Sequence, residues 1–201
     1  MPKIVDHEQR RVEIGEALLR VLARDGVQQV SIRSVAAEAG WTRGVIEHYF
    51  ADRDDLLLFA YRLALKREAE VVFYSQVESP TDRLISLLLR ALPIDEVSSL
   101  DFRIFLGLVG RLADRPELAS ALSEDHREYE LRVRSYVHLA VEAGELRSDI
   151  PVETIAHHLS VFVDGLGIHC ALYPESSSSE TLEEKLRGFL WTLTPRESAK
   201  K

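Results

Sequence analysis

Apolar residues recur at spacings of three and four along almost the whole chain, and this periodicity is the strongest constraint on its fold. Between residues 8 and 24, for example, Ile14, Ala17, Leu18 and Val21 fall on one side of a helix with about 3.6 residues per turn. Few segments alternate apolar and polar residues, as the strands of a half-buried sheet do. The periodicity therefore predicts an all-α protein.

Capping residues and prolines set the limits of the predicted helices. Ser31 and Thr42 are favourable N-cap residues, Gly40 suits the left-handed position that ends a helix, and six of the seven prolines stand where a helix begins or ends. We predict about nine helices, over residues 8–24, 31–39, 43–49, 53–76, 81–92, 100–113, 117–143, 152–173 and 180–193.

Composition narrows the class of protein. With 46% hydrophobic residues the chain can bury a substantial core, and its single cysteine, Cys170, excludes a disulfide framework and a cysteine-based zinc site. No signal peptide and no uncharged run long enough to span a membrane is evident, so we expect a cytoplasmic protein without a membrane partner. The net charge is -8, yet residues 1–53 carry eight basic and eight acidic side chains. Only this N-terminal part can approach DNA at low electrostatic cost.

The segment SIRSVAAEAGWTRGVIEHYF, residues 31–50, has the pattern of a helix-turn-helix. Two steeply crossing helices need a small residue at their contact, a turn residue that tolerates positive φ, and an apolar residue that anchors the second helix. Ala36, Gly40 and Ile46 meet these needs. The N-terminal end of the second helix enters the DNA major groove in this motif.

Residues 39–56, AGWTRGVIEHYFADRDDL, resemble the corresponding segment of the TetR family of transcriptional regulators. The resemblance implies a DNA-binding repressor with a helix-turn-helix domain over residues 1–52 and a larger ligand-binding and dimerisation domain over 53–195. The charged residues that follow predict a disordered tail over 196–201. It places Arg53 where the family has a phosphate-binding lysine. The predicted DNA-contact residues are Ser31, Arg33, Trp41, Thr42, Arg43, Gly44, Val45, His48, Tyr49 and Arg53.

Two positions depart from the family pattern. Trp41 stands where a small aliphatic residue is usual, and Glu47 replaces a tyrosine that contacts the DNA backbone. An ionised glutamate cannot donate to phosphate, so Glu47 either accepts from cytosine or pairs with Arg43 one helical turn before it. The Ala-Gly spacing alone also fits an ordinary corner between two helices; the flanking residues Gly44, His48 and Arg53 favour DNA binding.

Two apolar stripes near the C-terminus indicate a homodimer interface. A twofold dimer would place two recognition helices about one DNA turn apart on a palindromic operator; the alternative is that both stripes pack only inside one subunit. The segment FVDGLGIHCALYP also resembles the TetR subgroup that includes the choline-responsive repressor. The predicted interface residues are Ile155, Leu159, Phe162, Val163, Leu166, Leu182, Leu186, Phe189, Leu190 and Leu193.

A small-molecule inducer is expected in the larger domain, with no metal and no cofactor, because the histidines lack a spacing that fixes a metal site. No catalytic motif was found, which leaves an enzyme as a remote alternative. An activator of the same fold, or an interaction module without DNA affinity, is the nearer alternative, supported by Glu47 and the acidic net charge. The predicted ligand-binding residues are Phe102, Arg103, Phe105, Arg111, Tyr136, His158, Asp164 and His169.

Overall fold

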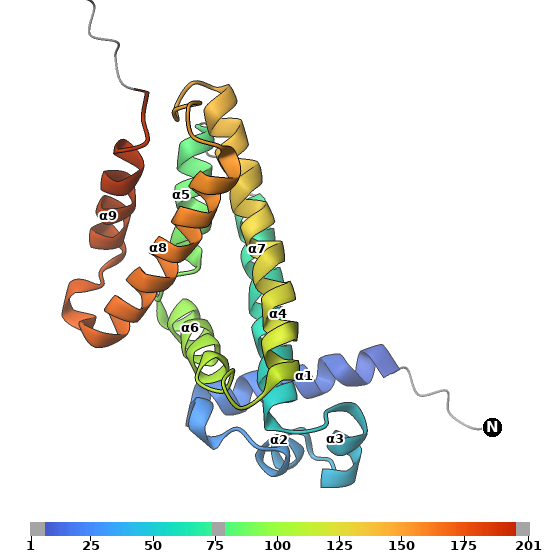
Figure 1. Cartoon of the computed structure of the whole chain (residues 1–201). Helices are drawn as coiled ribbons and strands as arrows, with labels where there is room; N and C mark the ends of the chain where they lie inside the picture. The colour runs from blue at the N-terminus through green and yellow to red at the C-terminus, as the bar shows by residue number, and fades with distance from the viewer. Residues whose placement is uncertain (1–6, 74–78, 196–201) are drawn as a thin grey trace, which may run out of the picture. The chain divides into compact units, whose positions relative to one another are not determined.

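The computed structural model describes residues 7–73 and 79–195, and within these ranges the chain is all-helical (Figure 1). Nine α-helices and two short 3-10 turns follow one another within these two ranges. The number of α-helices agrees with the prediction, which includes no 3-10 turn. The helices are α1 (His7–Asp25), α2 (Ile32–Ala39), α3 (Arg43–Tyr49), α4 (Arg53–Phe73), α5 (Pro80–Arg90), α6 (Glu96–Val109), α7 (Pro116–Glu142), α8 (Val152–Leu172) and α9 (Ser179–Trp191), and the 3-10 turns are η1 (Val27–Gln29) and η2 (Pro174–Ser176).

The helix limits differ from the prediction in one instructive place. Helix α6 begins at Glu96 rather than at residue 100, because Asp95 and Ser98 cap it: the Ser98 amide donates to Asp95 Oδ1 at 2.7 Å, and the Ser98 hydroxyl accepts from the Asp95 amide at 3.0 Å. This reciprocal pair satisfies amides that a helix start leaves without partners. The predicted end of the fourth helix at residue 76 and the predicted tail over 196–201 lie outside the described residues.

Capping fixes the angle between α2 and α3. The Ser31 hydroxyl accepts from the Ser34 amide at 3.0 Å, and Ser34 reciprocates, which makes a capping box at the start of α2. At its end Gly40 has φ 70°, and the Trp41 amide donates back to the Ala36 carbonyl at 3.0 Å. A side chain at position 40 would strain this left-handed turn.

Contacts within the chain divide it into two compact units, each with its own core. The N-terminal unit combines residues 7–64 with 103–122. In it, α1 packs on α2 and α2 on α3, and a methyl group added at Gly15 would lie 2.8 Å from the Phe59 ring, so α1 and α4 touch closely here. The Phe59 ring also meets that of Phe50 edge to face at 5.2 Å. The predicted domain boundary at residue 52 remains a prediction.

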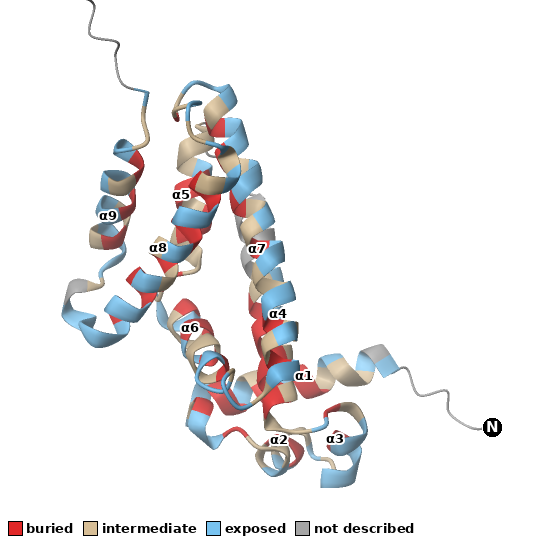
Figure 2. Cartoon of the chain, viewed as in Figure 1, coloured by how far each residue is buried: buried red, intermediate tan, exposed pale blue. Residues whose placement is uncertain are grey.

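The C-terminal unit combines residues 65–102 with 123–195, and its core joins α5, α7, α8 and α9. Figure 2 shows buried residues on each of these helices. The predicted dimer stripes belong largely to this core. Ile155, Leu159, Val163, Leu166, Leu182, Leu186 and Leu190 are all at most 8% exposed.

These buried members are enclosed by the fold of their own subunit, and the predicted dimer interface remains a prediction. A side chain that is already enclosed by its own subunit cannot contribute further contact area. Phe162 and Phe189 stack on one another at 4.5 Å and, with Leu193, are partly buried against the same core. A partner would have to meet the opposite faces of α8 and α9.

Helix α8 is the one helix among residues 7–73 and 79–195 that is long and apolar enough to cross a membrane, with a mean hydropathy of 1.3. The sequence-based expectation that no segment reaches this length is corrected here. Eight residues of α8 are buried inside the C-terminal unit, so its apolarity matches that of a core helix.

Candidate nucleic-acid interface

One face of helix α3 is exposed to solvent, and the opposite face packs against the rest of the N-terminal unit. Ile46 is fully buried and Phe50, directly after the helix, is 1% exposed. Thr42, Arg43, Gly44, Val45, Glu47 and His48 are exposed. A side chain added at Gly44 would meet nothing within 4 Å, so its absence leaves an open approach to the helix backbone. The two buried residues fix the helix, and the exposed ones form a surface that can enter a major groove.

Arg43 and Glu47 form an ion pair across one turn of α3, with the Arg43 Nε at 2.7 Å from Glu47 Oε1. The sequence predicts that Glu47 either accepts from cytosine or pairs with Arg43, and in the protein without DNA it pairs with Arg43. The Arg43 side chain is 73% exposed, and exposed pairs of this spacing are worth about 0.3 to 0.5 kcal/mol. A bidentate contact to guanine is worth about 1 to 3 kcal/mol, so DNA can draw Arg43 away from Glu47.

The remaining residues predicted on α2 and its ends differ in what their side chains do. Arg33 is exposed. The Ser31 hydroxyl is engaged in the capping box, which leaves it less suited to a phosphate than the sequence suggests. Thr42 occupies the N-cap position of α3, as predicted, but its side chain makes no capping hydrogen bond.

The Arg53 side chain hydrogen-bonds to the protein backbone. Its Nε donates to the Val30 carbonyl at 3.0 Å and its Nη2 to the Val27 carbonyl at 2.9 Å. These bonds tie the first turn of α4 to the turn η1 that precedes α2. The structure thus gives Arg53 an internal role that its resemblance to a phosphate-binding lysine does not predict.

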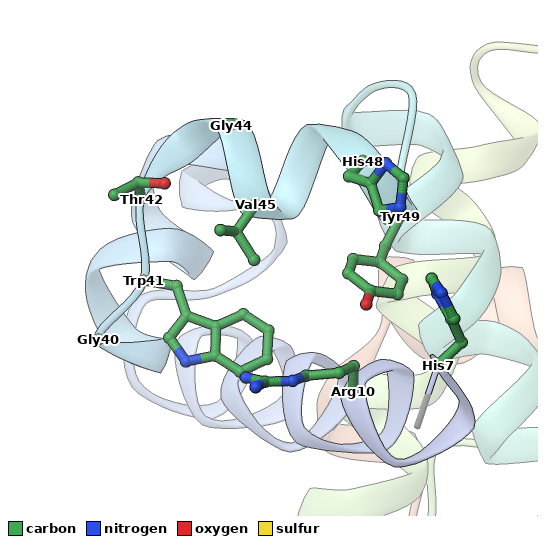
Figure 3. A pocket seen from close by; sticks show the side chains of 9 residues that line it. All are labelled: His7, Arg10, Gly40, Trp41, Thr42, Gly44, Val45, His48 and Tyr49. Carbon is green, nitrogen blue, oxygen red and sulfur yellow. The ribbon is translucent and has the colours of Figure 1, made fainter. Parts of the chain in front are cut away.

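A groove of about 780 Å³ runs beside α3, between that helix and the start of α1 (Figure 3). At one end the Arg10 guanidinium lies 4.5 Å from the centre of the Trp41 ring. At the other, the rings of His7, His48 and Tyr49 gather, with centroids 5.2 to 5.9 Å apart. Sequence reasoning missed His7 and Arg10, because no spacing pattern links α1 to residues more than thirty positions later.

Behind the recognition surface, a cluster of charges holds the start of α4. Asp54 is 4% exposed and accepts from Arg115 Nη1 at 3.0 Å and Arg111 Nη2 at 3.3 Å, while Arg115 Nη2 also donates to Asp52 at 2.8 Å. Burial acts to raise the pKa of Asp52, but Arg115 and the neighbouring amides outweigh it, so that pKa is lowered. Arg111, predicted to bind ligand, is part of this cluster.

The other predicted ligand-binding residues are divided between the two units. Phe105 stacks on Tyr61 at 5.8 Å in the N-terminal unit, where Arg103 is exposed. In the C-terminal unit, Tyr136 packs at the edge of the core, and His158 and His169 are exposed.

Two predicted ligand residues, Phe102 and Asp164, occupy the same region of the C-terminal unit. A methyl group added at Gly167 would clash with the Phe102 ring, so this glycine lets the ring rest on α8. One turn earlier on α8, burial raises the pKa of Asp164, against the opposing effect of His126, whose Nε2 lies 4.0 Å from the carboxylate. Tyr129 lies beside His126, with ring centroids 6.2 Å apart. The cluster combines aromatic rings with a partly desolvated carboxylate.

Comparisons with known proteins agree with this arrangement. Residues 14–59 match the family described as bacterial regulatory proteins, tetR family, and residues 80–195 match the C-terminal domain of BetI-type transcriptional repressors. The HTH-type transcriptional regulator PksA of Bacillus subtilis is 28% identical over 176 residues, which cover 87% of this chain and 84% of that protein. The regulator BetI of Proteus mirabilis is 27% identical over 183 residues, covering 89% and 88%.

A solved structure of a transcriptional regulator from Saccharomonospora viridis, in complex with choline, has the same fold. Its TM-score is 0.77 at 22% identity, covering 94% of this chain and all of that one. The C-terminal match alone spans more than half of the chain, and these proteins are transcriptional regulators, not enzymes. The chain thus belongs to the TetR family, and it is a DNA-binding transcriptional repressor with a C-terminal domain of the BetI type.

Proposed function

We propose that this repressor acts in the cytoplasm as a homodimer, binds a palindromic operator through α3, and leaves it when an organic cation binds in the C-terminal unit. The exposed face of α3, anchored by fully buried Ile46, carries the DNA-binding part of the proposal. Ligand and operator would favour different spacings of the two recognition helices in the dimer, so that each weakens the binding of the other.

Operator selection tests the DNA-binding mode. Purified protein is equilibrated with random duplexes at physiological salt, and the bound DNA is sequenced. We expect a palindrome whose half-sites are centred about 10 base pairs apart or a multiple of that, bound with a steep salt dependence. A single asymmetric site would contradict the dimeric mode, and no enrichment at any salt concentration would contradict operator recognition itself.

The faces of α8 and α9 that point away from the core support the dimer. Val161, Ile168 and Leu172 follow one another along α8 and are 57%, 47% and 65% exposed. Gly165 lies between them, with open space where a side chain would be. On α9, Trp191 is 75% exposed. Apolar surface of this extent is costly in a monomer, and a small residue at its centre allows two helices to approach closely.

Two matched lysine substitutions test this interface. Val161→Lys places a charge in the proposed interface, whereas Val97→Lys changes the same residue type at a similar exposure, 48%, on α6. We expect light scattering to show monomers for Val161→Lys and dimers for Val97→Lys. Dimers of equal stability for both variants would place the subunit contact elsewhere.

The cluster around Asp164 supports an organic cation as the ligand. A carboxylate whose charge is disfavoured by burial gains from a nearby cation, and aromatic faces attract quaternary ammonium groups. Phe102 and Tyr129 are 7% and 5% exposed, so a ligand would reach their rings only if neighbouring side chains repack. The choline found in the Saccharomonospora viridis protein belongs to this chemical class.

Choline and its neutral carbon isostere, 3,3-dimethylbutan-1-ol, are suitable probes. We expect choline alone to raise the melting temperature and to release the operator, and Asp164→Asn to abolish both effects. Glu128→Gln, which removes an exposed carboxylate from α7, serves as the control. Because the pKa of Asp164 is raised, choline affinity should fall as acidification protonates this carboxylate. The proposal that the ligand is an organic cation is contradicted if both probes raise the melting temperature equally, or if neither probe raises it.

A further inference from the structure

We infer that the groove between α1 and α3 binds one sugar–phosphate strand of the operator, with Arg10, Trp41 and the His7–His48–Tyr49 ring cluster as its contacts. This inference rests on α3 entering the major groove, as proposed above. It adds the start of α1 to the DNA-binding surface and gives Trp41 a function.

The lining of the groove has the chemistry of an anion-binding surface. Its donors are the Arg10 guanidinium, the imidazoles of His7 and His48, the hydroxyls of Thr42 and Tyr49, and the Trp41 indole N–H. Among the described residues, none of the nine that line it is an aspartate or a glutamate. Glu13 contacts Arg10 from outside this set, at 3.7 Å, with both side chains partly exposed, so the pair is weak enough to yield to phosphate.

The lining is also partly apolar, which suits a deoxyribose next to a phosphate. Val45 projects into the groove between the Trp41 ring and the ring cluster, as Figure 3 shows. A simple anion site would not need these surfaces. A nucleic-acid strand presents charge and apolar sugar faces in alternation along its length.

The position of the groove agrees with the dimensions of DNA. An α-helix with its side chains is about 10 to 12 Å across, and the major groove is about 12 Å wide, so α3 can lie in it. A helix of this size in the groove has a phosphate strand along each side. The α1–α3 groove opens along one side of α3, since Thr42, Gly44, Val45 and His48 all contribute to its wall.

Trp41 holds Arg10 in the orientation that this contact needs. The guanidinium lies over the indole face at 4.5 Å, which limits the rotamers available to a long side chain that is otherwise partly exposed. A small aliphatic residue, as is usual in the family at this position, offers no such face. Arg10 is thus a backbone-contact residue, and Trp41 positions it.

The test measures the affinity of the whole 201-residue chain for operator and for unrelated duplex DNA over a range of salt concentrations. Arg10→Gln should weaken both complexes about 3- to 10-fold and reduce the salt slope by about one per subunit that contacts DNA. Arg127→Gln, an exposed arginine of α7, removes the same charge from the C-terminal unit and should change neither. Trp41→Val should reproduce most of the loss, and Trp41→Phe should restore much of it.

Each variant is first shown to melt as wild type does. If Arg10→Gln matches Arg127→Gln in affinity and salt slope while wild type binds its operator, the groove does not hold the DNA backbone, although the proposed operator binding stands. A loss for Arg10→Gln that Trp41→Val does not share would overturn the positioning role of the indole. A loss confined to operator DNA would assign Arg10 to base contacts and overturn the backbone assignment.

Discussion

Arg53→Met provides a sharp test of the internal role of Arg53, because two interpretations of this residue predict different outcomes. If its guanidinium holds the Val27 and Val30 carbonyls, as in the structure, the substitution removes two charge-assisted hydrogen bonds at 2.9 and 3.0 Å. Methionine retains most of the apolar stem, so packing changes little. If Arg53 instead contacts phosphate, stability is unaffected and DNA affinity falls.

The expected loss of stability follows from the exposure of the side chain. Hydrogen bonds to a charged group contribute about 1.5 to 3 kcal/mol each when they are well buried. The Arg53 side chain is 33% exposed, so water partly replaces both bonds, and we expect a total loss of about 2 kcal/mol. With a urea m-value of about 2 kcal/mol per molar, the midpoint should fall by about 1 M.

Urea unfolding at one fixed protein concentration, followed by circular dichroism, measures this shift. Arg33→Met serves as the control, because Arg33 is exposed on α2 and is also a predicted DNA contact. Its midpoint should stay at the wild-type value while its salt slope for DNA binding decreases. The reasoning is refuted if Arg53→Met behaves in the same way, with an unchanged midpoint and a reduced salt slope.

Three further predictions concern the stability of each unit. Gly167→Ala should lower the free energy of unfolding by about 1 to 3 kcal/mol, because the new methyl group displaces the Phe102 ring. The urea midpoint measures this loss, and an unchanged midpoint would mean that the ring moves without loss of stability. Asp54→Asn should lower the free energy of unfolding by about 2 kcal/mol, since it removes the buried negative charge to which Arg111 and Arg115 both donate. Asp114→Asn, at an exposed position, is the control and should leave this free energy unchanged. The Ser98 amide lowers the pKa of Asp95, so this carboxylate contributes stability above its unfolded pKa of about 4 that is lost as the pH falls through the folded value. Asp95→Asn should flatten the stability profile between about pH 5 and pH 3, and an unaltered profile would argue against this cap.

Local signals in the sequence predict most of the fold. Helix α3 begins and ends where its cap residues place it, and Gly40 adopts the predicted left-handed conformation. These features depend on neighbours a few positions away, which the sequence displays directly. The predicted start of α6 is four residues late, because apolar periodicity does not reveal the Asp95–Ser98 cap that begins the helix.

Features that depend on distant residues were harder to predict. Periodicity reveals that Leu182 and Leu186 share one buried face, but it does not distinguish burial inside a subunit from burial between subunits. The sequence likewise shows that position 53 is basic. It does not show that the Arg53 guanidinium donates to backbone carbonyls 23 and 26 residues earlier in the chain. The identification of a TetR-type repressor, and not of an enzyme, is confirmed by the family matches.

The pair between Arg43 and Glu47 has a consequence for the search along the chromosome. At a DNA site that offers no guanine edge within reach, Arg43 stays paired with the Glu47 carboxylate, and the two charges on α3 cancel. The recognition helix then adds little attraction to phosphate, and a protein of net charge -8 spends less time on each wrong site. Because competing sites outnumber an operator by about a million or more, an arginine that its own helix neutralises shortens the search as well as sharpening the choice of sequence.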